Sequence, residues 1–146
     1  MQRPHMEQFL DFFGNHPGLF AALGVVALLL VANEVHGHLT GGKRLSVPEA
    51  VRLINDRDPI ILDVRTPADF RKGHLLRARN APVTKLDEHL GPFAKDKSKP
   101  VLVYCALGSN AVTAAERLRK QGFAEVYPLR GGLNAWLGAN LPVTTK

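Results

Sequence analysis

Hydrophobic and polar positions divide this chain of 146 residues into one long apolar run and a later region of short alternating patterns. The run, Gly18 to Ala32, reads GLFAALGVVALLLVA and has no polar side chain in fifteen residues. A helix of that length is about 22 Å long, whereas a bilayer core is about 30 Å thick and takes about 20 residues to cross. We therefore predict a transmembrane helix over residues 17–35, with its polar ends near the membrane interfaces.

Two other interpretations of this run are a buried helix and a cleaved signal peptide. A buried helix of a small soluble domain would show a polar stripe at the helical period, and the run has none. A signal peptide stays an alternative because Val35-His36-Gly37 resembles a weak cleavage site, although a long, partly acidic segment precedes the run. Residues 1–16 are then an N-terminal flank, and residues 36–42, HGHLTGG, are a polar linker.

The charges on either side of the run predict its orientation. Lys43, Arg44 and Arg52 follow it, whereas Arg3 is the one basic side chain before it. Positively charged flanks stay on the cytoplasmic side of a membrane. We expect a single-pass protein of the cell (inner) membrane with its C-terminal domain in the cytoplasm.

From residue 43 to residue 143 short apolar runs alternate with amphipathic stretches. The segments predicted as strands are Pro59 to Val64 (PIILDV), Asn80 to Val83, Pro100 to Tyr104 (PVLVY) and Glu125 to Leu129. Two helices are predicted from their start motifs, the capping box Ser46 to Glu49 and the cap Thr66 to Asp69. Two more are predicted over Lys85 to Phe93 and Ala111 to Gln121, and a short one follows Gly131-Gly132. This alternation predicts an α/β fold, a mainly parallel sheet with helices on both faces.

Charge and cysteine usage narrow the function classes. The chain has a net charge of +6, and eighteen of its nineteen Lys and Arg residues follow residue 40, so the domain attracts anions. No basic run with interleaved aromatic residues occurs, which argues against nucleic acid as a partner. The single cysteine, Cys105, excludes an internal disulfide and any paired-cysteine zinc or redox motif.

Cys105 directly follows the predicted strand PVLVY and directly precedes the loop Ala106-Leu107-Gly108-Ser109-Asn110, which leads into a helix. In parallel sheets the binding crevice lies at the carboxyl ends of the strands. Backbone N–H groups of such a loop and the helix N-terminus stabilise an anion, which favours the reactive thiolate. The alternative is that Cys105 is a small buried hydrophobic residue that ends a strand.

The sequence resembles the rhodanese family of sulfurtransferase domains over about residues 43 to 143. The matching stretches are Leu62-Asp63-Val64-Arg65 with Asp69-Phe70, Gly73-His74-Leu75 with Ala78 and Asn80, Val101 to Cys105 with Gly108, and Leu129 to Gly132 with Ala135-Trp136 and Leu141-Pro142-Val143. The resemblance implies a rhodanese-like, five-stranded parallel sheet. It also implies a cysteine that accepts a sulfane sulfur as a persulfide and passes it to a thiol or another nucleophile. The N-terminal run is similar to that of single-pass bacterial members.

The resemblance assigns roles to individual residues. Cys105 is the expected nucleophile and persulfide carrier, and the expected partners are a small sulfur donor and a thiol or protein acceptor. The N–H groups of Ala106, Leu107, Gly108, Ser109, Asn110 and Ala111 would cradle the distal sulfur or a substrate oxyanion. Asp63 and Arg65 would form a supporting shell, and His74 would be structural. This chemistry requires no metal and no organic cofactor.

Two departures from the family pattern bear on the function. Active members often end the loop with a cationic or hydroxyl residue, where this chain has Asn110. Arg130 would compensate if it faces the same crevice. Arg77 stands where the family usually has glycine, so we expect the local turn to differ.

Two further interpretations remain. Asn110 favours a catalytically silent, rhodanese-like binding module at the membrane. A thiol phosphatase of related fold would need a loop one residue longer that closes with arginine. Ala111 occupies that position, and the next arginine is Arg117.

Overall fold

The computed structural model describes residues 6, 12–40, 42–93 and 95–146; within it, the side chains of Glu34 and residues 36–40 lie outside the description. The chain divides into two compact units, residues 1–40 and residues 41–146. Because the two units are not placed relative to one another, each is considered by itself.

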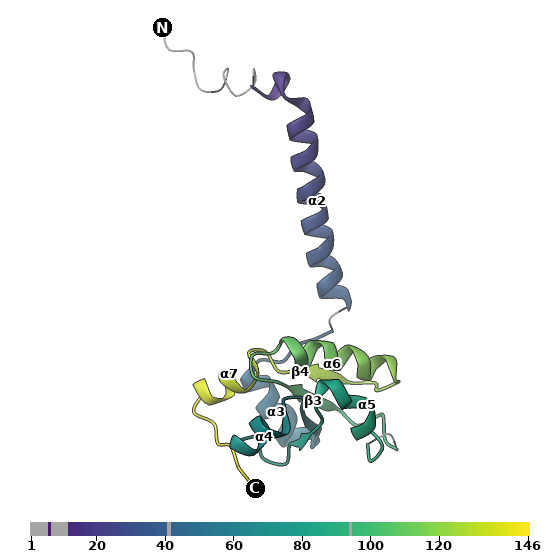
Figure 1. The fold of residues 1–146 in the computed structure, drawn as a ribbon, viewed down its shortest axis with the longest axis vertical. Coiled ribbons are helices and arrows are strands. Elements are labelled where there is room, and N and C mark those ends of the chain that lie inside the picture. The colour runs from purple at the N-terminus through teal and green to yellow at the C-terminus, as the bar shows by residue number, and fades with distance from the viewer. Residues whose placement is uncertain (1–5, 7–11, 41, 94) are drawn as a thin grey trace. The chain divides into compact units, whose positions relative to one another are not determined.

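The main element of the first unit is helix α2, Pro17–Thr40, with 24 residues (Figure 1). It contains the whole apolar run and continues beyond residue 35, so residues 36–40 of the expected linker are helical. Most large apolar side chains of the run are exposed, as at Leu19, Leu23 and Leu28. In the described part of the chain, no helix combines the length and the apolar character that a membrane span needs. The transmembrane helix therefore stays a prediction.

The second unit is built on a parallel sheet of short strands. Its described residues form β1 (Ile60–Asp63), β2 (Arg79–Asn80), β3 (Val101–Tyr104) and β4 (Val126–Pro128) in the order β2-β1-β3-β4. Every pairing is parallel, as the alternation of elements predicted.

The expected fifth strand is not formed in these described residues. Leu45 instead makes a single parallel bridge to Leu129 at the edge beyond β4, with hydrogen bonds from its N–H to Pro128 O and from Arg130 N–H to its carbonyl. A single bridge does not make a strand. The pairing goes no further because the capping box at Ser46 starts helix formation at the next residue.

The helices of this unit are α3 (Val47–Arg57), α4 (Pro67–Lys72), α5 (Leu86–His89), α6 (Ser109–Lys120) and α7 (Gly132–Gly138), with a 3₁₀ turn at Val83–Lys85. The helix predicted over Lys85 to Phe93 is wrong in length, since α5 ends at His89. Pro92 explains the early end: it disfavours helical geometry at Gly91 and cannot donate a backbone hydrogen bond.

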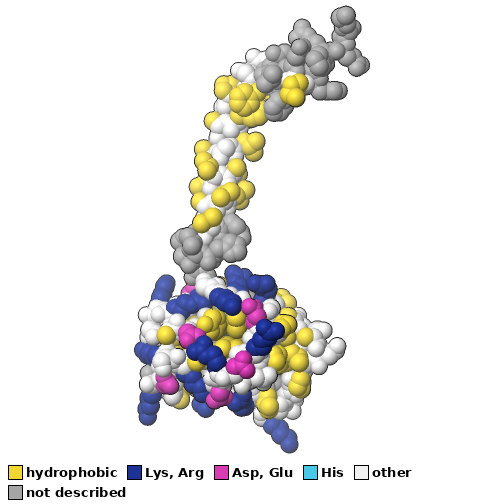
Figure 2. Space-filling model, turned by 180° about the vertical axis from the view of Figure 1, so that it is seen from behind, with side chains coloured by type: hydrophobic (Ala, Val, Ile, Leu, Met, Phe, Trp, Pro, Cys, Tyr) yellow, Lys and Arg dark blue, Asp and Glu magenta, His cyan; other side chains and the backbone are white. Residues whose placement is uncertain are grey.

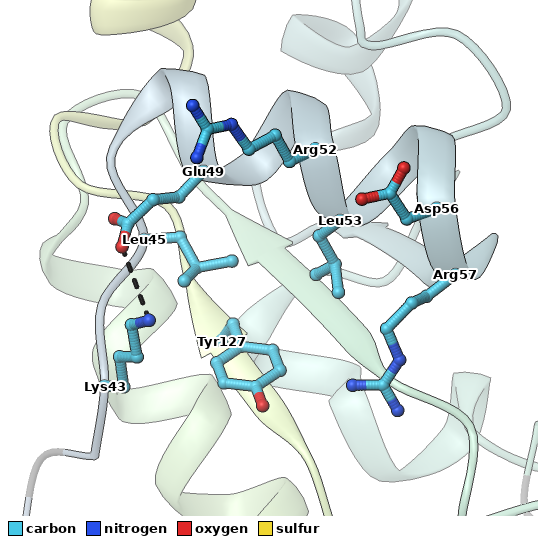
Figure 3. Close-up of a pocket in the computed structure, with 8 residues that line it drawn as sticks. All are labelled: Lys43, Leu45, Glu49, Arg52, Leu53, Asp56, Arg57 and Tyr127. Atoms are coloured by element: carbon cyan, nitrogen blue, oxygen red, sulfur yellow. Dashed lines mark ion pairs between the residues drawn. The ribbon is translucent and has the colours of Figure 1, made fainter.

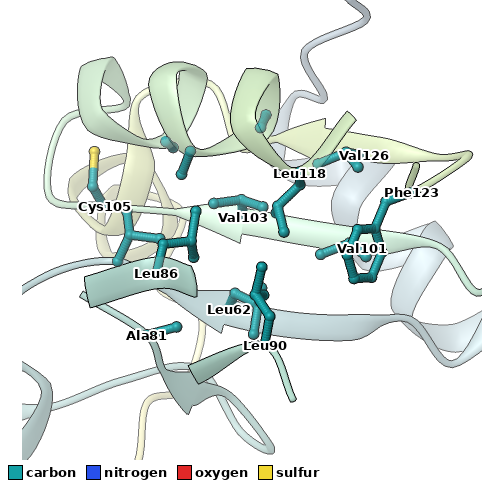
Figure 4. Packing of buried hydrophobic residues seen from close by; sticks show 14 residues of the cluster. Leu62, Ala81, Leu86, Leu90, Val101, Val103, Cys105, Leu118, Phe123 and Val126 are labelled. Atoms are coloured by element: carbon teal, nitrogen blue, oxygen red, sulfur yellow. The ribbon is translucent and has the colours of Figure 1, made fainter. Parts of the chain in front are cut away.

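The sheet separates two hydrophobic clusters. On one face Val101 and Val103 pack with Leu62, with Leu86 of α5 and with Leu118 of α6 (Figure 4). On the other face Leu102 and Tyr104 pack with residues of α3 and α7, among them Ala50 and Trp136. Successive residues of β3 thus face opposite helical layers, which is why its sequence is apolar throughout.

The first turn of α3 is held by the predicted capping box. The Ser46 N–H and the Ser46 hydroxyl each donate to Glu49 Oε2 at 2.8 Å. These hydrogen bonds, together with Lys43, lower the pKa of Glu49 from 4.5 to about 2.

Candidate active site at Cys105

Cys105 stands directly after β3, at the carboxyl edge of the parallel sheet. Its thiol is free and almost completely buried. The backbone N–H of Gly108 donates to Cys105 Sγ at 3.0 Å. The loop after β3 therefore turns back on the sulfur atom, and a backbone dipole points at it.

The loop takes this shape because Gly108 has a φ of 109°, in the region that favours glycine. Gly108 is also the residue from which α6 begins. A Cβ atom on Gly108 would lie 3.3 Å from Gly131 N and 3.4 Å from Leu129 O, so the loop packs tightly against the segment after β4.

The start of α7 holds the other side of the loop. Leu133 N–H donates to Cys105 O at 2.8 Å, and Asn134 N–H donates to Ala106 O at 3.1 Å. Gly132, with a φ of 58°, makes this approach possible, because a Cβ atom there would lie 2.3 Å from Cys105 O. The sequence carried a signal for this contact, the pair Gly131-Gly132 directly after a strand, but only the fold shows what the glycine touches.

A pocket of about 580 Å³ opens in front of the loop. Its described lining is Val64, Arg65, Thr66, Asp69, Pro82, Val83, Thr84, Cys105, Ala106, Leu107, Ser109 and Asn110. Of the residues singled out from the sequence, the structure brings together Cys105, Arg65 and four loop residues. Gly108 and Ala111 belong to the loop without lining the pocket. Thr66 and Asp69 were noted only as the start of a helix, and residues 82–84 carry no motif, so their place in the wall of the pocket was missed.

Asp63 and Arg65 form a buried ion pair beside the pocket. Arg65 Nε lies 3.0 Å and 3.1 Å from the two carboxylate oxygens of Asp63, and Arg65 Nη2 donates to Asp63 Oδ2 at 2.5 Å. Arg65 Nη2 also donates to Gly73 O at 2.7 Å. Burial opposes the charge on Arg65, but the hydrogen bonds and the attraction of Asp63 outweigh it and raise its pKa. The pair ties β1 to the turn at Gly73.

The backbone around this pair is held by neutral side chains. Asn80 Nδ2 donates to Asp63 O at 3.1 Å and to Arg65 O at 2.9 Å. Leu75 N–H donates to the hydroxyl of Tyr104 at 3.0 Å. Burial, and then the nearby charge of Asp63, raise the pKa of Tyr104, so this hydroxyl is neutral.

The second charged side chain of the lining, Asp69, is also paired. Lys72 Nζ donates to Asp69 Oδ1 at 3.0 Å, and the Thr66 hydroxyl donates to Asp69 Oδ2 at 2.9 Å. The hydrogen bonds of Lys72 and then Thr66 lower the pKa of Asp69 below its usual value. The described wall of the pocket therefore presents charges that already have partners.

Arg130 does not join the described lining of the pocket. Its side chain is exposed, and its N–H donates to Leu45 O at the far edge of the sheet. The carbonyl of Leu45 fixes the backbone of Arg130 at the β4 edge. The compensating charge expected from Arg130 is therefore not part of this wall.

His74 and Arg77 lie in the turn before β2. His74 stacks on Phe70 with 3.7 Å between ring centroids, and its ring nitrogens lie 2.9 Å from Phe70 O and 3.2 Å from Lys146 O. These contacts fit a structural histidine. Arg77 has a φ of 65°, so the expectation of a different turn is wrong. The arginine keeps the glycine-like conformation, and its side chain pairs with Asp58.

A second pocket, of about 310 Å³, lies between α3 and β4 (Figure 3). Its floor contains Leu45, Leu53 and Tyr127, and charged side chains stand around them. Figure 2 shows hydrophobic side chains near the middle of one face of this unit, with charged ones around them. Lys43 pairs with Glu49 at 3.3 Å, and Arg57 with Glu125 at 2.6 Å. This pocket holds no thiol, so the chemistry is expected at Cys105.

The chemistry that the site offers centres on sulfur. Among the described residues there is no group of three His, Cys, Asp or Glu side chains that could hold a metal ion. The arrangement at Cys105 offers a nucleophilic sulfur, a backbone donor at 3.0 Å and an accessible pocket. Such a site suits nucleophilic group transfer.

Comparisons with known proteins identify a family model and related proteins that match this chain. The family model of the rhodanese-like domain matches residues 46–139. The protein YibN of Escherichia coli K12 is 33% identical over 139 residues, which cover 94% of this chain and 97% of YibN. The thiosulfate sulfurtransferase GlpE of Coxiella burnetii is 40% identical over 94 residues, 64% of this chain and 86% of GlpE.

Solved structures share the fold. A rhodanese-like domain from Anabaena matches with a TM-score of 0.63 and 26% identity over 70% of this chain and 79% of that one. A rhodanese-related protein from Thermoplasma volcanium matches with a TM-score of 0.64 over 71% of this chain and 99% of that one. At 24% identity, the second match speaks for the fold alone.

Proposed function

The chain belongs to the rhodanese-like family, and from this premise we propose that Cys105 carries a sulfane sulfur as a persulfide and passes it to a thiol acceptor. The observation that carries the proposal is the position of Cys105, which lines the pocket and whose Sγ lies 3.0 Å from the backbone nitrogen of Gly108. Sulfurtransferases occur among the relatives, which supports this reaction class at the level of the family.

The transfer takes place in two balanced steps. The Cys105 thiolate attacks the terminal sulfur of the donor, the bond between that sulfur and the rest of the donor breaks, and the donor leaves with the electron pair. An acceptor thiolate then attacks the terminal sulfur of the Cys105 persulfide. The acceptor becomes the persulfide, and Cys105 returns to the thiolate. No electrons are gained or lost overall, so neither step needs an oxidant or a reductant.

Backbone dipoles favour the charged forms of the sulfur in both steps. The Gly108 N–H points at Sγ, and the twelve residues of α6 begin directly after it. N–H groups at the start of a helix stabilise negative charge. The thiolate and the persulfide are both anions, so the same groups serve the empty and the loaded state.

Mass spectrometry of the intact full-length protein tests this proposal. After incubation with a persulfide donor, the parent is expected to gain the mass of one sulfur atom, whereas Cys105→Ser is expected to gain none, because its hydroxyl stays protonated near neutral pH. Circular dichroism of both proteins checks that the variant is folded. Turnover in the Cys105→Ser variant equal to that of the parent would remove the proposal.

The second candidate function is a binding module without sulfur transfer. It is favoured by Asn110, which leaves the end of the loop without a charge. The same measurement separates the two candidates. Absence of a sulfur adduct with both thiosulfate and organic persulfides would support the binding module.

A second part of the proposal concerns where in the cell the protein is located. We infer that α2 attaches the protein to the cell membrane as a single-pass segment, with the second unit in the cytoplasm. The inference is supported by the uninterrupted apolar run Gly18 to Ala32 and by the exposure of its large side chains. Exposed apolar surface of this extent marks a membrane or protein contact.

A further inference from the structure

We propose that Leu107, with Pro82 and Val83, forms a docking surface for an apolar side chain next to the sulfur-bearing cysteine of a protein substrate. The proposal rests on the proposed function, because it concerns the pocket of Cys105. It goes further in assigning the class of substrate, a neutral peptide segment, and the residue that selects it.

Leu107 differs in exposure from the cysteine whose pocket it lines. It is 68% exposed, although Cys105, only two residues earlier, is almost completely buried. A single exposed leucine needs no explanation by itself. Leu107, however, lines the same pocket as Cys105, and the half-buried side chains of Pro82 and Val83 contribute to the same lining. Leu107, Pro82 and Val83 therefore supply apolar surface to the pocket that an incoming sulfur atom enters.

The charges of the pocket argue against a small anion as the preferred substrate. Of the described lining residues, Arg65 and Asp69 are charged, and each has an opposite charge beside it. Asp63 neutralises Arg65 from within the core. An anion that enters the pocket would lose water without meeting a cation that lacks a partner. A peptide brings only the single charge of its sulfur atom, so it loses less hydration than a doubly charged oxyanion.

The size and the polar groups of the pocket fit a peptide. Its volume of about 580 Å³ falls within the range of pockets that hold organic ligands of drug size, whereas an ion of a few atoms would fill little of it. Thr84, Ser109 and Asn110 add uncharged hydrogen-bonding groups to the lining. Such side chains can both donate to and accept from a peptide backbone. The pocket thus combines an apolar contact with neutral polar ones.

Binding of two short neutral peptides to the full-length protein tests the proposal. Both peptides carry serine in place of the reactive cysteine, so no sulfur is transferred. One has leucine on each side of this serine, and the other has serine there. With the parent protein in a mild detergent, we expect the leucine peptide to bind about tenfold more tightly in fluorescence anisotropy, the gain expected for a partly buried leucine. In Leu107→Ser the ratio of the two dissociation constants should fall to about one.

Leu76→Ser is the matched control. Leu76 is 67% exposed and lies outside the described lining of this pocket, so its replacement removes the same amount of apolar surface elsewhere. The ratio of the two dissociation constants should stay as in the parent. Equal affinities of the parent for the two peptides, or equal losses in the two variants, would overturn the proposal. Because these peptides cannot be sulfurated, this failure is separate from a failure of Cys105 to load sulfur.

Discussion

Asn110 lies at the end of the loop that follows Cys105. Its uncharged side chain lines the pocket. A doubly charged donor such as thiosulfate must lose water on entry, and a cation at this position would offset part of the cost. Asn110→Arg is therefore expected to raise kcat/KM for thiosulfate by roughly ten- to a hundredfold. The value for a neutral persulfide donor should change little.

Kinetics with both donors, in the parent and in Asn110→Arg, provide the measurement. Equal changes for the two donors, or no change for thiosulfate, would mean that Asn110 does not face the donor. The neighbouring Arg65 already has Asp63 as its partner, which is why the new charge is expected to act on its own.

A second prediction for a single residue concerns Gly132, which packs against the backbone of Cys105. Its φ is 58°, and a Cβ atom added to it would lie 2.3 Å from Cys105 O, which leaves no room for a side chain. Gly132→Ala should lower the free energy of unfolding by about 2 kcal/mol or more and reduce transfer by displacing the Cys105 carbonyl. Gly138→Ala is the control in the same helix, because a Cβ atom there meets nothing within 4 Å. Urea denaturation that finds the two variants equally stable would contradict this interpretation of the contact.

At the scale of elements, α3 depends on the capping box between Ser46 and Glu49. The folded protein holds the pKa of Glu49 at about 2, against 4.5 for the free side chain, because Ser46 donates to its carboxylate. A carboxylate whose pKa is lowered on folding stabilises the folded protein at any pH above its pKa in the unfolded chain. This contribution is lost as the pH falls toward its pKa in the folded protein. Glu49→Gln removes the charge.

The parent should therefore be more stable than Glu49→Gln at pH 7, and the difference should shrink as the pH falls from 4.5 toward 2. Free energies of unfolding from urea denaturation at several pH values check this expectation. Glu88→Gln is a control on α5, where the carboxylate also lies in the first turn but the N-cap residue, Lys85, makes no capping hydrogen bond with its side chain. A difference between parent and Glu49→Gln that stays constant with pH would show that the carboxylate does not act through its charge.

At the scale of the whole molecule, the two units divide the proposed tasks. Residues 41–146 contain Cys105 and every described wall of its pocket, whereas α2 contains the apolar run. A protein that begins near residue 41 should therefore be found in the soluble fraction with the same kcat/KM as the full chain. The full chain should sediment with membranes after cell lysis. Recovery of the full chain in the soluble fraction, or cleavage near Gly37, would favour the signal peptide instead.

Much of the fold followed from local patterns. The capping box predicted the start of α3, and the continuous apolar runs predicted β1 and β3, because each of these features acts between residues close together in the chain. The length of α5 was wrong because the apolar pattern was given more weight than Pro92. The fifth strand was expected from the resemblance alone, and in the described residues Leu45 makes a single bridge in its place.

For the site, the sequence by itself determined that Cys105 directly follows a buried strand and that a glycine-containing loop leads from it into a helix. Both are properties of neighbouring residues. Only the tertiary structure decided that Pro82, Val83 and Asp69 wall the pocket, that Gly132 touches the Cys105 carbonyl and that Arg130 lies elsewhere. These contacts join segments far apart in the chain, and their partners are set by the order of the strands and by the packing of helices on the sheet.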